Sequence, residues 1–379
     1  MWQRQWTPAV VDAVEQAPFE QLMVLSAEIS WDGGTAVTHT VALPNLADGA
    51  GLVVRVGVPP EGAAVATTLA EVVAHVLVEH PGAAGVQLDI DLPTRRLGEY
   101  PPWLEALRPV VGPRWLEVTT LPTWLGSPAL TALAETADRT VLQVHWLDPH
   151  APDRLLDPHA VRHIEEMALL RRSFRVGLPA YGYDLVLDED GVVKAVSAEQ
   201  GRIALSRGTR TRSLWADPAE VAALVAGLLA DRPPELAGLV WFRLPTAQDR
   251  LSWPAPTLAA VREGRVPVAV PSVELTREAD SGVLNVVVYN HGEAVLPLPT
   301  VQLDRSVVLA DGVGDYTWAA ATTRFEPHPS GSPLRPGASR TVGWLRPDKD
   351  PPYVTLVPAP LRLDHDAVPP RSGVRPVLR

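Results

Sequence analysis

The stretch that decides the fold is Gly85-Val86-Gln87-Leu88-Asp89-Ile90-Asp91, followed by Leu92-Pro93. Polar and aliphatic side chains alternate strictly along it. Because successive side chains of a strand point to opposite faces, Gln87, Asp89 and Asp91 share one face and the other is aliphatic. Two adjacent carboxylates at the end of a buried strand repel each other and lose hydration, which costs free energy unless partners or a task compensate. The strand therefore predicts either a functional site or a neutralised pair of aspartates.

The first 250 or so residues repeat a pattern of short apolar run and amphipathic helix, which predicts a parallel sheet. Eight such strands within about 250 residues match the number and length of a (β/α)8 barrel. We therefore predict an α/β fold of the TIM-barrel type. The expected strands lie at residues 2–6, 22–28, 52–58, 85–91, 116–122, 140–146, 174–181 and 238–244, and the expected helices at 8–17, 64–79, 97–107, 127–137, 158–171 and 218–229.

Two segments depart from this pattern, and the C-terminal part replaces it. Residues 33–51 indicate an extended or hairpin connection, and residues 184–212 indicate a hairpin insertion that would overhang the barrel mouth. Further on, short strands follow one another without helices, which is typical of a small antiparallel β-sandwich. We predict a barrel domain over residues 1–265 and a β-sandwich accessory domain over residues 266–379.

Composition narrows the class of partner. The 379 residues are 46% hydrophobic and carry a net charge of −11, with a pI near 5.4 and no basic run. This balance argues against nucleic acid or an anionic membrane as partner, and no stretch is long and apolar enough to span a membrane. The absence of cysteine excludes disulfides, thiolate metal sites and cysteine nucleophiles. No signal peptide is visible, export from a longer precursor stays open, and localisation and oligomeric state are not predicted.

Polar residues recur where the predicted strands end, which is where barrel enzymes place their sites. A purely structural barrel would fill its interior with branched apolar residues, so this set favours a functional site. No second histidine or third carboxylate stands at ligand spacing, so we predict neither a metal site nor a cofactor. The set comprises Ser26, Glu28, Arg55, Gln87, Asp89, Asp91, Thr119, Thr120, Trp124, Gln143, His145, Tyr181, Tyr183, Trp241 and Arg243.

Several members of the set have structural alternatives. Glu28 and Arg55 lie on neighbouring predicted strands and could form a structural ion pair. A single histidine such as His145 is more often a hydrogen-bonded core residue than a catalyst, and Trp241 could be an ordinary core aromatic. Thr94-Arg95-Arg96 follows the two aspartates directly and could neutralise them.

Five motifs together carry a first resemblance. They are Trp2-Gln-Arg-Gln-Trp-Thr-Pro8, Gln87-Leu-Asp-Ile-Asp-Leu-Pro93, Thr120-Leu-Pro-Thr-Trp-Leu-Gly126, Val141-Leu-Gln-Val-His145 and Pro179-Ala-Tyr-Gly-Tyr183. In combination they resemble a bacterial family of unknown function with a glycosidase-like barrel. The resemblance implies the fold and assigns no activity.

A second, more distant resemblance concerns two strands. Ala84-Gly-Val-Gln-Leu-Asp-Ile-Asp91 is similar to the fourth-strand motif D-G-x-D-x-D-x-E of family 18 chitinase-like glycoside hydrolases, and Asp91 stands where that family has its acid glutamate. Gly238-Leu-Val-Trp241 resembles that family's last strand, which ends in a tryptophan. Ala84 and Gln87 replace two aspartates of the motif, so the family's substrate-assisted mechanism is not carried over.

These patterns predict a glycoside hydrolase that acts on a poly- or oligosaccharide. Asp91 would be the general acid, with its pKa raised by ionised Asp89, and Glu28 would be the second carboxylate. An alternative is a non-catalytic carbohydrate- or cell-envelope-binding protein on the same fold, in which Arg95 or Arg96 holds both aspartates. The predicted substrate contacts are Arg55, Gln87, Gln143, His145, Tyr181 and Arg243, with Trp241 as a stacking floor.

Overall fold

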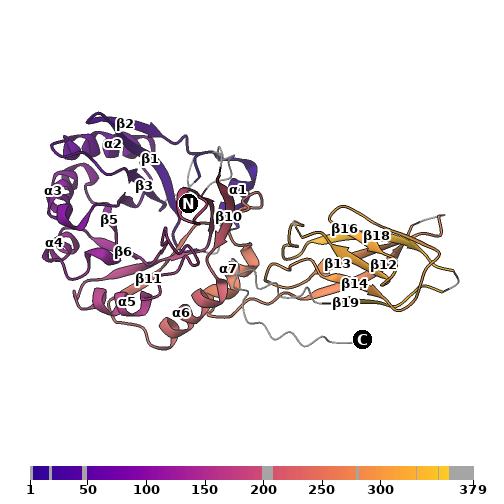
Figure 1. Cartoon of the computed structure of the whole chain (residues 1–379). Helices are drawn as coiled ribbons and strands as arrows, with labels where there is room; N and C mark the ends of the chain where they lie inside the picture. The colour runs from indigo at the N-terminus through magenta and orange to yellow at the C-terminus, as the bar shows by residue number, and fades with distance from the viewer. Residues whose placement is uncertain are drawn as a thin grey trace. The chain divides into compact units, whose positions relative to one another are not determined.

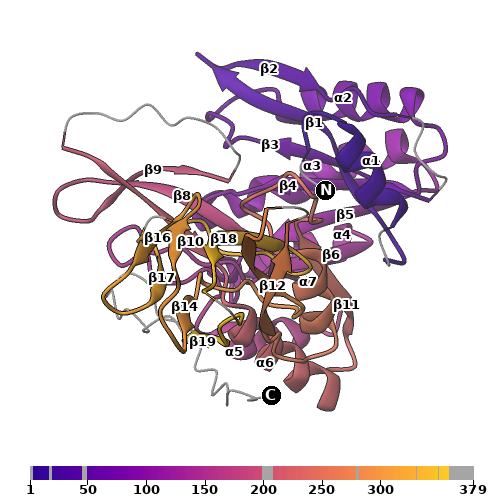
Figure 2. The same cartoon turned by 90° about the vertical axis from the view of Figure 1, so that its right-hand side faces the viewer.

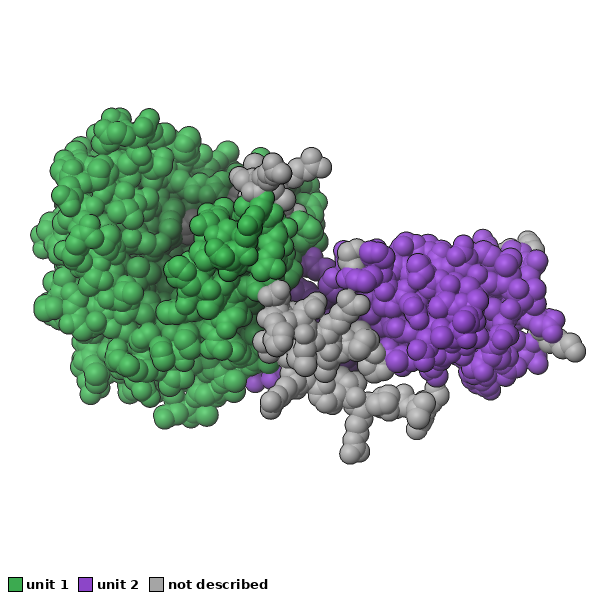
Figure 3. Space-filling model, viewed as in Figure 1, with its two compact units in different colours: residues 1–253 green, residues 254–379 purple. Residues whose placement is uncertain are grey.

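The computed structural model describes residues 3–16, 19–44, 49–198, 208–278, 281–329, 331–348 and 350–357. The chain divides into two compact units, Met1–Trp253 and Pro254–Arg379 (Figure 3). The division falls before helix α7 (Ala255–Arg262), in which the Thr257 hydroxyl donates to the backbone carbonyl of Glu293 in the second unit. The predicted domain boundary, between residues 265 and 266, lies after this helix and stays a prediction.

The first unit is built on an eight-stranded sheet in the order β11-β7-β6-β5-β4-β3-β1-β2. All neighbours pair in parallel except β2, which pairs antiparallel with β1. Gly33 and Gly34 join these two strands, and both have the positive φ that glycine adopts without steric cost. The strands are β1 (Met23–Asp32), β2 (Thr35–Thr40), β3 (Gly51–Val56), β4 (Gly85–Ile90), β5 (Trp115–Thr120), β6 (Arg139–Gln143), β7 (Phe174–Pro179) and β11 (Leu236–Phe242).

The seven parallel strands lie where the sequence predicted strands from residue 22 onward, but the predicted first strand is wrong. Residues 3–6, the part of the predicted strand 2–6 that the structure describes, pair with no strand. The segment is too short and polar to compete with the local signal that follows, since Pro8 at the first helical position starts α1 (Pro8–Glu15). The eighth strand of the sheet is β2, within the segment 33–51 for which an extended or hairpin connection was expected.

Helices cover the outer side of the curved sheet (Figure 1). Their starts follow the sequence signals: the side chains of Ser127 and Asp217 accept hydrogen bonds from the N–H groups of Ala129 and Ala219, and proline follows each cap. The sheet buries its aliphatic side chains, as Val86, Leu88 and Ile90 of β4 illustrate. The helices after the strands are α2 (Val65–Glu79), η1 (Thr94–Glu99), α3 (Tyr100–Val111), η2 (Pro122–Trp124), α4 (Pro128–Thr136), α5 (Ala160–Ala168) and α6 (Pro218–Ala230).

The predicted insertion forms a small antiparallel sheet in the order β10-β8-β9. It consists of β8 (Gly182–Leu187), β9 (Val193–Ser197) and β10 (Arg210–Trp215), so the expected hairpin is accompanied by a third strand. Asp188 holds the turn between β8 and β9, because its Oδ1 accepts from the N–H groups of Asp190 and Val192. Figure 2 shows this sheet extending away from the main sheet of the first unit.

The second unit contains two four-stranded antiparallel sheets that contribute to one hydrophobic core. Alternation in β13 buries Leu284, Val286 and Val288, and Phe325 and Tyr316 join them from the other sheet. No helix in the described ranges has the length and apolar character needed to cross a membrane. One sheet consists of β12 (Pro271–Arg277), β13 (Leu284–Asn290), β18 (Ser339–Arg346) and β15 (Leu309–Gly312), and the other of β16 (Tyr316–Ala319), β17 (Arg324–Pro327), β14 (Thr300–Leu303) and β19 (Val354–Val357).

Candidate functional site

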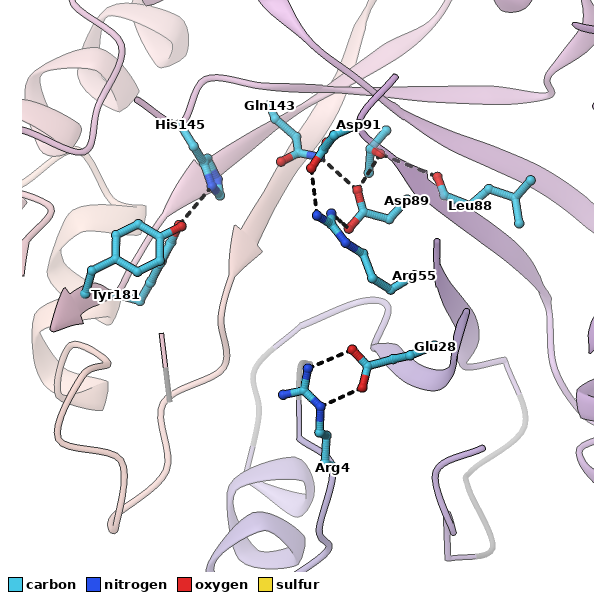
Figure 4. A network of polar contacts seen from close by, with 11 residues as sticks. Arg4, Glu28, Arg55, Leu88, Asp89, Asp91, Gln143, His145 and Tyr181 are labelled. Atoms are coloured by element: carbon cyan, nitrogen blue, oxygen red, sulfur yellow. Dashed lines mark hydrogen bonds and ion pairs between the residues drawn. The ribbon is translucent and has the colours of Figure 1, made fainter. Parts of the chain in front are cut away.

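Arg55 joins the two aspartates that the sequence singled out. It is the Cα partner of Asp89 across β3 and β4, so their side chains share one face of the sheet. Its Nη1 lies 2.5 Å from Asp89 Oδ2, and its Nη2 lies 2.7 Å from Asp91 Oδ2 (Figure 4). Burial lowers the pKa of Arg55, but the two carboxylates outweigh it and the pKa is raised overall. One guanidinium therefore compensates both negative charges.

Arg95 and Arg96, which the alternative interpretation paired with the aspartates, do not bind them. Arg96 makes two hydrogen bonds of 2.8 Å to Glu99 and a third of 2.5 Å to the carbonyl of Pro59. Arg95 is exposed, and among the described residues no ion pair joins it to Asp89 or Asp91.

Asp89 is the buried member of the pair, with a side chain only 4% exposed. Its Oδ1 accepts hydrogen bonds from the Thr119 hydroxyl at 2.7 Å and from Gln143 Nε2 at 3.1 Å, in addition to the arginine on Oδ2. Buried carboxylates need such donors, and these come from three neighbouring strands or strand ends. The arrangement fixes the Asp89 side chain in one orientation.

Asp91 is the accessible member, with 40% of its side chain exposed. Burial of the carboxyl and the negative charge of Asp89 raise its pKa, and Arg55 opposes the rise. Arg55 Nη2 donates to Oδ2, and no residue within the described ranges donates to Oδ1. Asp91 therefore presents one uncommitted carboxyl oxygen at the end of β4.

Glu28, the predicted second carboxylate, is bound by an arginine outside the sheet. Its two oxygens accept hydrogen bonds of 2.6 and 2.7 Å from Arg4 (Figure 4). Glu28 is the Cα partner of Arg55 across β1 and β3, so it lies on the same face as the two aspartates. Arg4 comes from the segment that was predicted to be the first strand.

Aromatic residues form the other side of the site. The Tyr181 hydroxyl lies 3.4 Å from His145 Nδ1 and 2.6 Å from the Tyr183 hydroxyl. The Phe242 ring packs 5.0 Å from the ring of Tyr181 and 5.7 Å from that of His145. Burial lowers the pKa of His145 to about 4, against the pull of Asp89, so the imidazole is neutral at pH 7.

Two predicted substrate contacts are committed to other partners. Gln87 donates to Glu117 at 2.6 Å, and this fully buried glutamate also lies 3.3 Å from Arg175. Gln87 lies two residues before Asp89 in β4, so Gln87 and its partner Glu117 lie closer to the amino ends of the strands than the aspartates do. Arg243 is buried, donates to Asp249 at 2.7 Å and donates to the carbonyl of Ala198.

Strand β11 presents a different aromatic residue from the one expected. Gln143 is the partner of Gly177, and Gly177 is the partner of Val240, so Val240 and Phe242 share the face of Gln143. Trp241 then lies on the opposite face. The two-residue period gives the faces of a strand only once one residue is placed, and β11 carries no charged residue that would have placed it.

The described part of the chain holds no group of three or more metal-ligating side chains. A model of a protein family described as "Domain of unknown function (DUF3142)" matches residues 54–247, which is half of the chain. The chain belongs to this family. The match confirms the resemblance to a family of unknown function, and a second domain of unknown function (DUF8456) matches residues 273–348. No curated protein matches the chain.

Solved structures that resemble this member of the DUF3142 family do so at low similarity. The chitinase ChiA74 from Bacillus thuringiensis is 10% identical over 81% of this chain and 80% of that one, with a TM-score of 0.37. The Bacillus cereus spore cortex-lytic enzyme SleL is 12% identical over 69% and 71%, with a TM-score of 0.44. The tamarind chitinase-like lectin is 11% identical over 50% and 66%, with a TM-score of 0.29. Similarity at this level assigns no ligand or activity to the chain.

Proposed function

We propose that the first unit is a glycoside hydrolase that acts on a poly- or oligosaccharide, with Asp91 as general acid. The observation that carries the proposal is the pairing of a partly exposed carboxyl, whose pKa is raised, with the buried Asp89 beside it. Two carboxyl groups in unlike environments are what acid catalysis of glycoside cleavage requires. In this proposal the curved sheet, with seven parallel strands and antiparallel β2, closes as a variant of the TIM-type barrel within residues 1–265, and residues 266–379 form a β-sandwich accessory domain.

The acid step uses the oxygen that Arg55 leaves uncommitted. A proton on Asp91 Oδ1 leaves the contact between Oδ2 and Arg55 intact. Transfer of this proton to the glycosidic oxygen accompanies cleavage of the bond between that oxygen and the sugar's anomeric carbon, and the bonding electrons go to the oxygen. If Glu28 is the nucleophile, it bonds to the anomeric carbon, and water then displaces it and gives its proton to Asp91. If Glu28 is the base, it takes the proton from the water that attacks the anomeric carbon, and solvent protonates Asp91 again.

The second carboxylate and the substrate contacts follow from the same face. Glu28 is the proposed base or nucleophile, and its ion pair with Arg4 holds its side chain in place. Gln143 is the proposed hydrogen-bonding partner of a sugar hydroxyl, and buried Tyr181, with His145 behind it, acts through its bond to the Tyr183 hydroxyl. The ring of Phe242 takes the proposed role of an apolar surface for a sugar face in place of Trp241.

A second candidate function is carbohydrate binding without catalysis. The bond between Arg55 and both aspartates favours it, because a guanidinium next to Asp91 stabilises the ionised carboxylate, which has no proton to donate. In that case the polar face of the sheet binds a sugar and leaves it intact.

Release of reducing ends from a panel of glycans by the full chain tests the proposal. The parent protein should cleave at least one glycan, and Asp91→Asn should reduce the rate by about 10²–10⁴-fold. Asp12→Asn, an exposed change in α1, is the matched control and should have no effect. Binding of a glycan without cleavage by the parent protein would favour the second candidate.

A further inference from the structure

We propose that Tyr183 is a further sugar-contacting residue, whose hydroxyl donates a hydrogen bond to an acceptor oxygen of the ligand. This hydroxyl is the last member of a chain of hydrogen bonds that begins at His145 and passes through Tyr181. The direction of the chain is a property of the protein alone. The identity of the ligand rests on the proposed function.

The chain links three strands or strand ends. His145 follows β6, Tyr181 lies between β7 and β8, and Tyr183 lies within β8. The separation of 2.6 Å between the two tyrosine hydroxyls is that of a good hydrogen bond, and the separation of 3.4 Å to His145 Nδ1 is a longer one. Tyr181 is fully buried and Tyr183 is partly exposed, so the chain runs from the interior outward.

The neutral state of His145 limits its tautomers to two. If Nε2 carried the proton, a buried N–H would have no acceptor, because Nε2 has no partner among the described residues. Buried N–H groups without a partner are rarer than under-satisfied acceptors. The proton therefore belongs on Nδ1, which donates to the Tyr181 oxygen.

The tautomer of His145 determines where the hydroxyl protons of Tyr181 and Tyr183 point. With its oxygen accepting from His145, Tyr181 donates its own proton to the Tyr183 oxygen. The hydrogen bond with Tyr183 accordingly adds to burial in raising the pKa of Tyr181, whereas it opposes the rise that burial causes in the pKa of Tyr183. The Tyr183 oxygen then accepts the hydrogen bond from Tyr181, and the hydroxyl proton of Tyr183 points away from Tyr181.

The Tyr183 hydroxyl feels the charges of the proposed acid and its arginine. The charges of Arg55 and Asp91 both act on the pKa of Tyr183, which places its hydroxyl within electrostatic reach of that pair. Figure 4 shows the Tyr181 hydroxyl and the Arg55 guanidinium on facing sides of the site. A donor at this position recognises an acceptor, such as a carbonyl, hydroxyl or ring oxygen of a neutral sugar bound against Asp91.

The tautomer of His145 can be read without any ligand. In the full chain labelled with ¹⁵N-histidine at pH 7, the His145 signal, assigned by its loss in His145→Asn, should show a protonated Nδ1 and a bare Nε2. The Tyr181→Phe variant removes the acceptor and should shift the signal toward the other tautomer. A protonated Nε2, or an imidazolium, in the parent protein would overturn the proposal.

Calorimetric titration with chitotetraose and cellotetraose tests the contact itself. Tyr183→Phe should weaken binding of whichever probe the parent protein binds by about tenfold, because one hydrogen bond is lost. Tyr353→Phe, an exposed change in the second unit, should leave binding unchanged. Equal affinity of Tyr183→Phe and the parent protein would contradict the contact. If the parent protein binds neither probe, the sugar ligand falls with the proposed function, and the tautomer of His145 still decides the direction of the chain.

Discussion

Arg55 and Asp89 lie directly opposite each other on β3 and β4, and Arg55 Nη1 is 2.5 Å from Asp89 Oδ2. The same guanidinium reaches Asp91, so removing it would leave two neighbouring carboxylates without their cation. This relationship makes the stability of the sheet and the chemistry of the site depend on one side chain.

We expect Arg55→Gln to lower the free energy of unfolding by about 2–3 kcal/mol at pH 7. This is below the cost of breaking a fully buried ion pair, because a third of the Arg55 side chain is exposed. Arg162→Gln is the control, since Arg162 forms an exposed pair with Glu166 one helical turn away and should cost less than about 0.5 kcal/mol. Urea unfolding of both variants measures the difference, and equal losses would show that Arg55 does not hold the aspartates.

Glu117 should make stability depend on pH in a direction opposite to most carboxylates. Burial raises its pKa, although Arg175 and Gln87 oppose the rise. The folded state therefore binds the proton more tightly than the unfolded chain, and ionisation costs stability as the pH rises from the unfolded pKa through the raised folded one. Glu117→Gln removes the titration and keeps the shape of the side chain.

The measurement for Glu117 is the free energy of unfolding of the parent protein minus that of Glu117→Gln, from urea curves between about pH 4 and pH 7. We expect this difference to fall as the pH rises. A difference that rises with pH would mean that Arg175 and Gln87 outweigh burial.

Gly85 in the motif has a structural reason to be glycine. A Cβ at this position would collide with the ring and the carbonyl oxygen of Trp115 on the neighbouring strand. We expect Gly85→Ala to destabilise the first unit by about 2–3 kcal/mol, the cost of overpacking a core. Gly238→Ala in β11 is the control, because nothing lies within 4 Å of its Cβ, and it should change stability little. Thermal unfolding compares the two, and similar midpoints would contradict the steric argument.

Most of the fold could be predicted from local pattern, because period and length decide whether a segment forms a strand or a helix. The alternation from Gly85 to Asp91 placed β4 and the shared face of its polar residues correctly. The prediction of a strand at residues 2–6 was wrong because it depended on the same local pattern. Five residues show too little periodicity to distinguish a strand from a connecting segment.

The pairing of charges could not be predicted, because it depends on contacts between residues far apart in the chain. Arg55 lies 36 residues from Asp91, and Arg4 lies 24 from Glu28. Sequence proximity favoured Arg95 and Arg96 as partners of the aspartates, yet η1 turns Arg96 toward Glu99. Phe242 was missed because the face of β11 is set by its register with β7.

The most direct test of Asp91 as general acid compares two leaving groups in the Asp91→Asn variant. In a dinitrophenyl glycoside of the sugar that the parent protein cleaves, the dinitrophenolate group leaves without being protonated. The sugar hydroxyl that leaves from the natural glycosidic linkage needs a proton from a general acid. The account predicts that kcat/KM of Asp91→Asn falls by about 10²–10⁴-fold on the natural linkage and changes little on the dinitrophenyl glycoside. Equal losses on both substrates, or no loss on either, would contradict it.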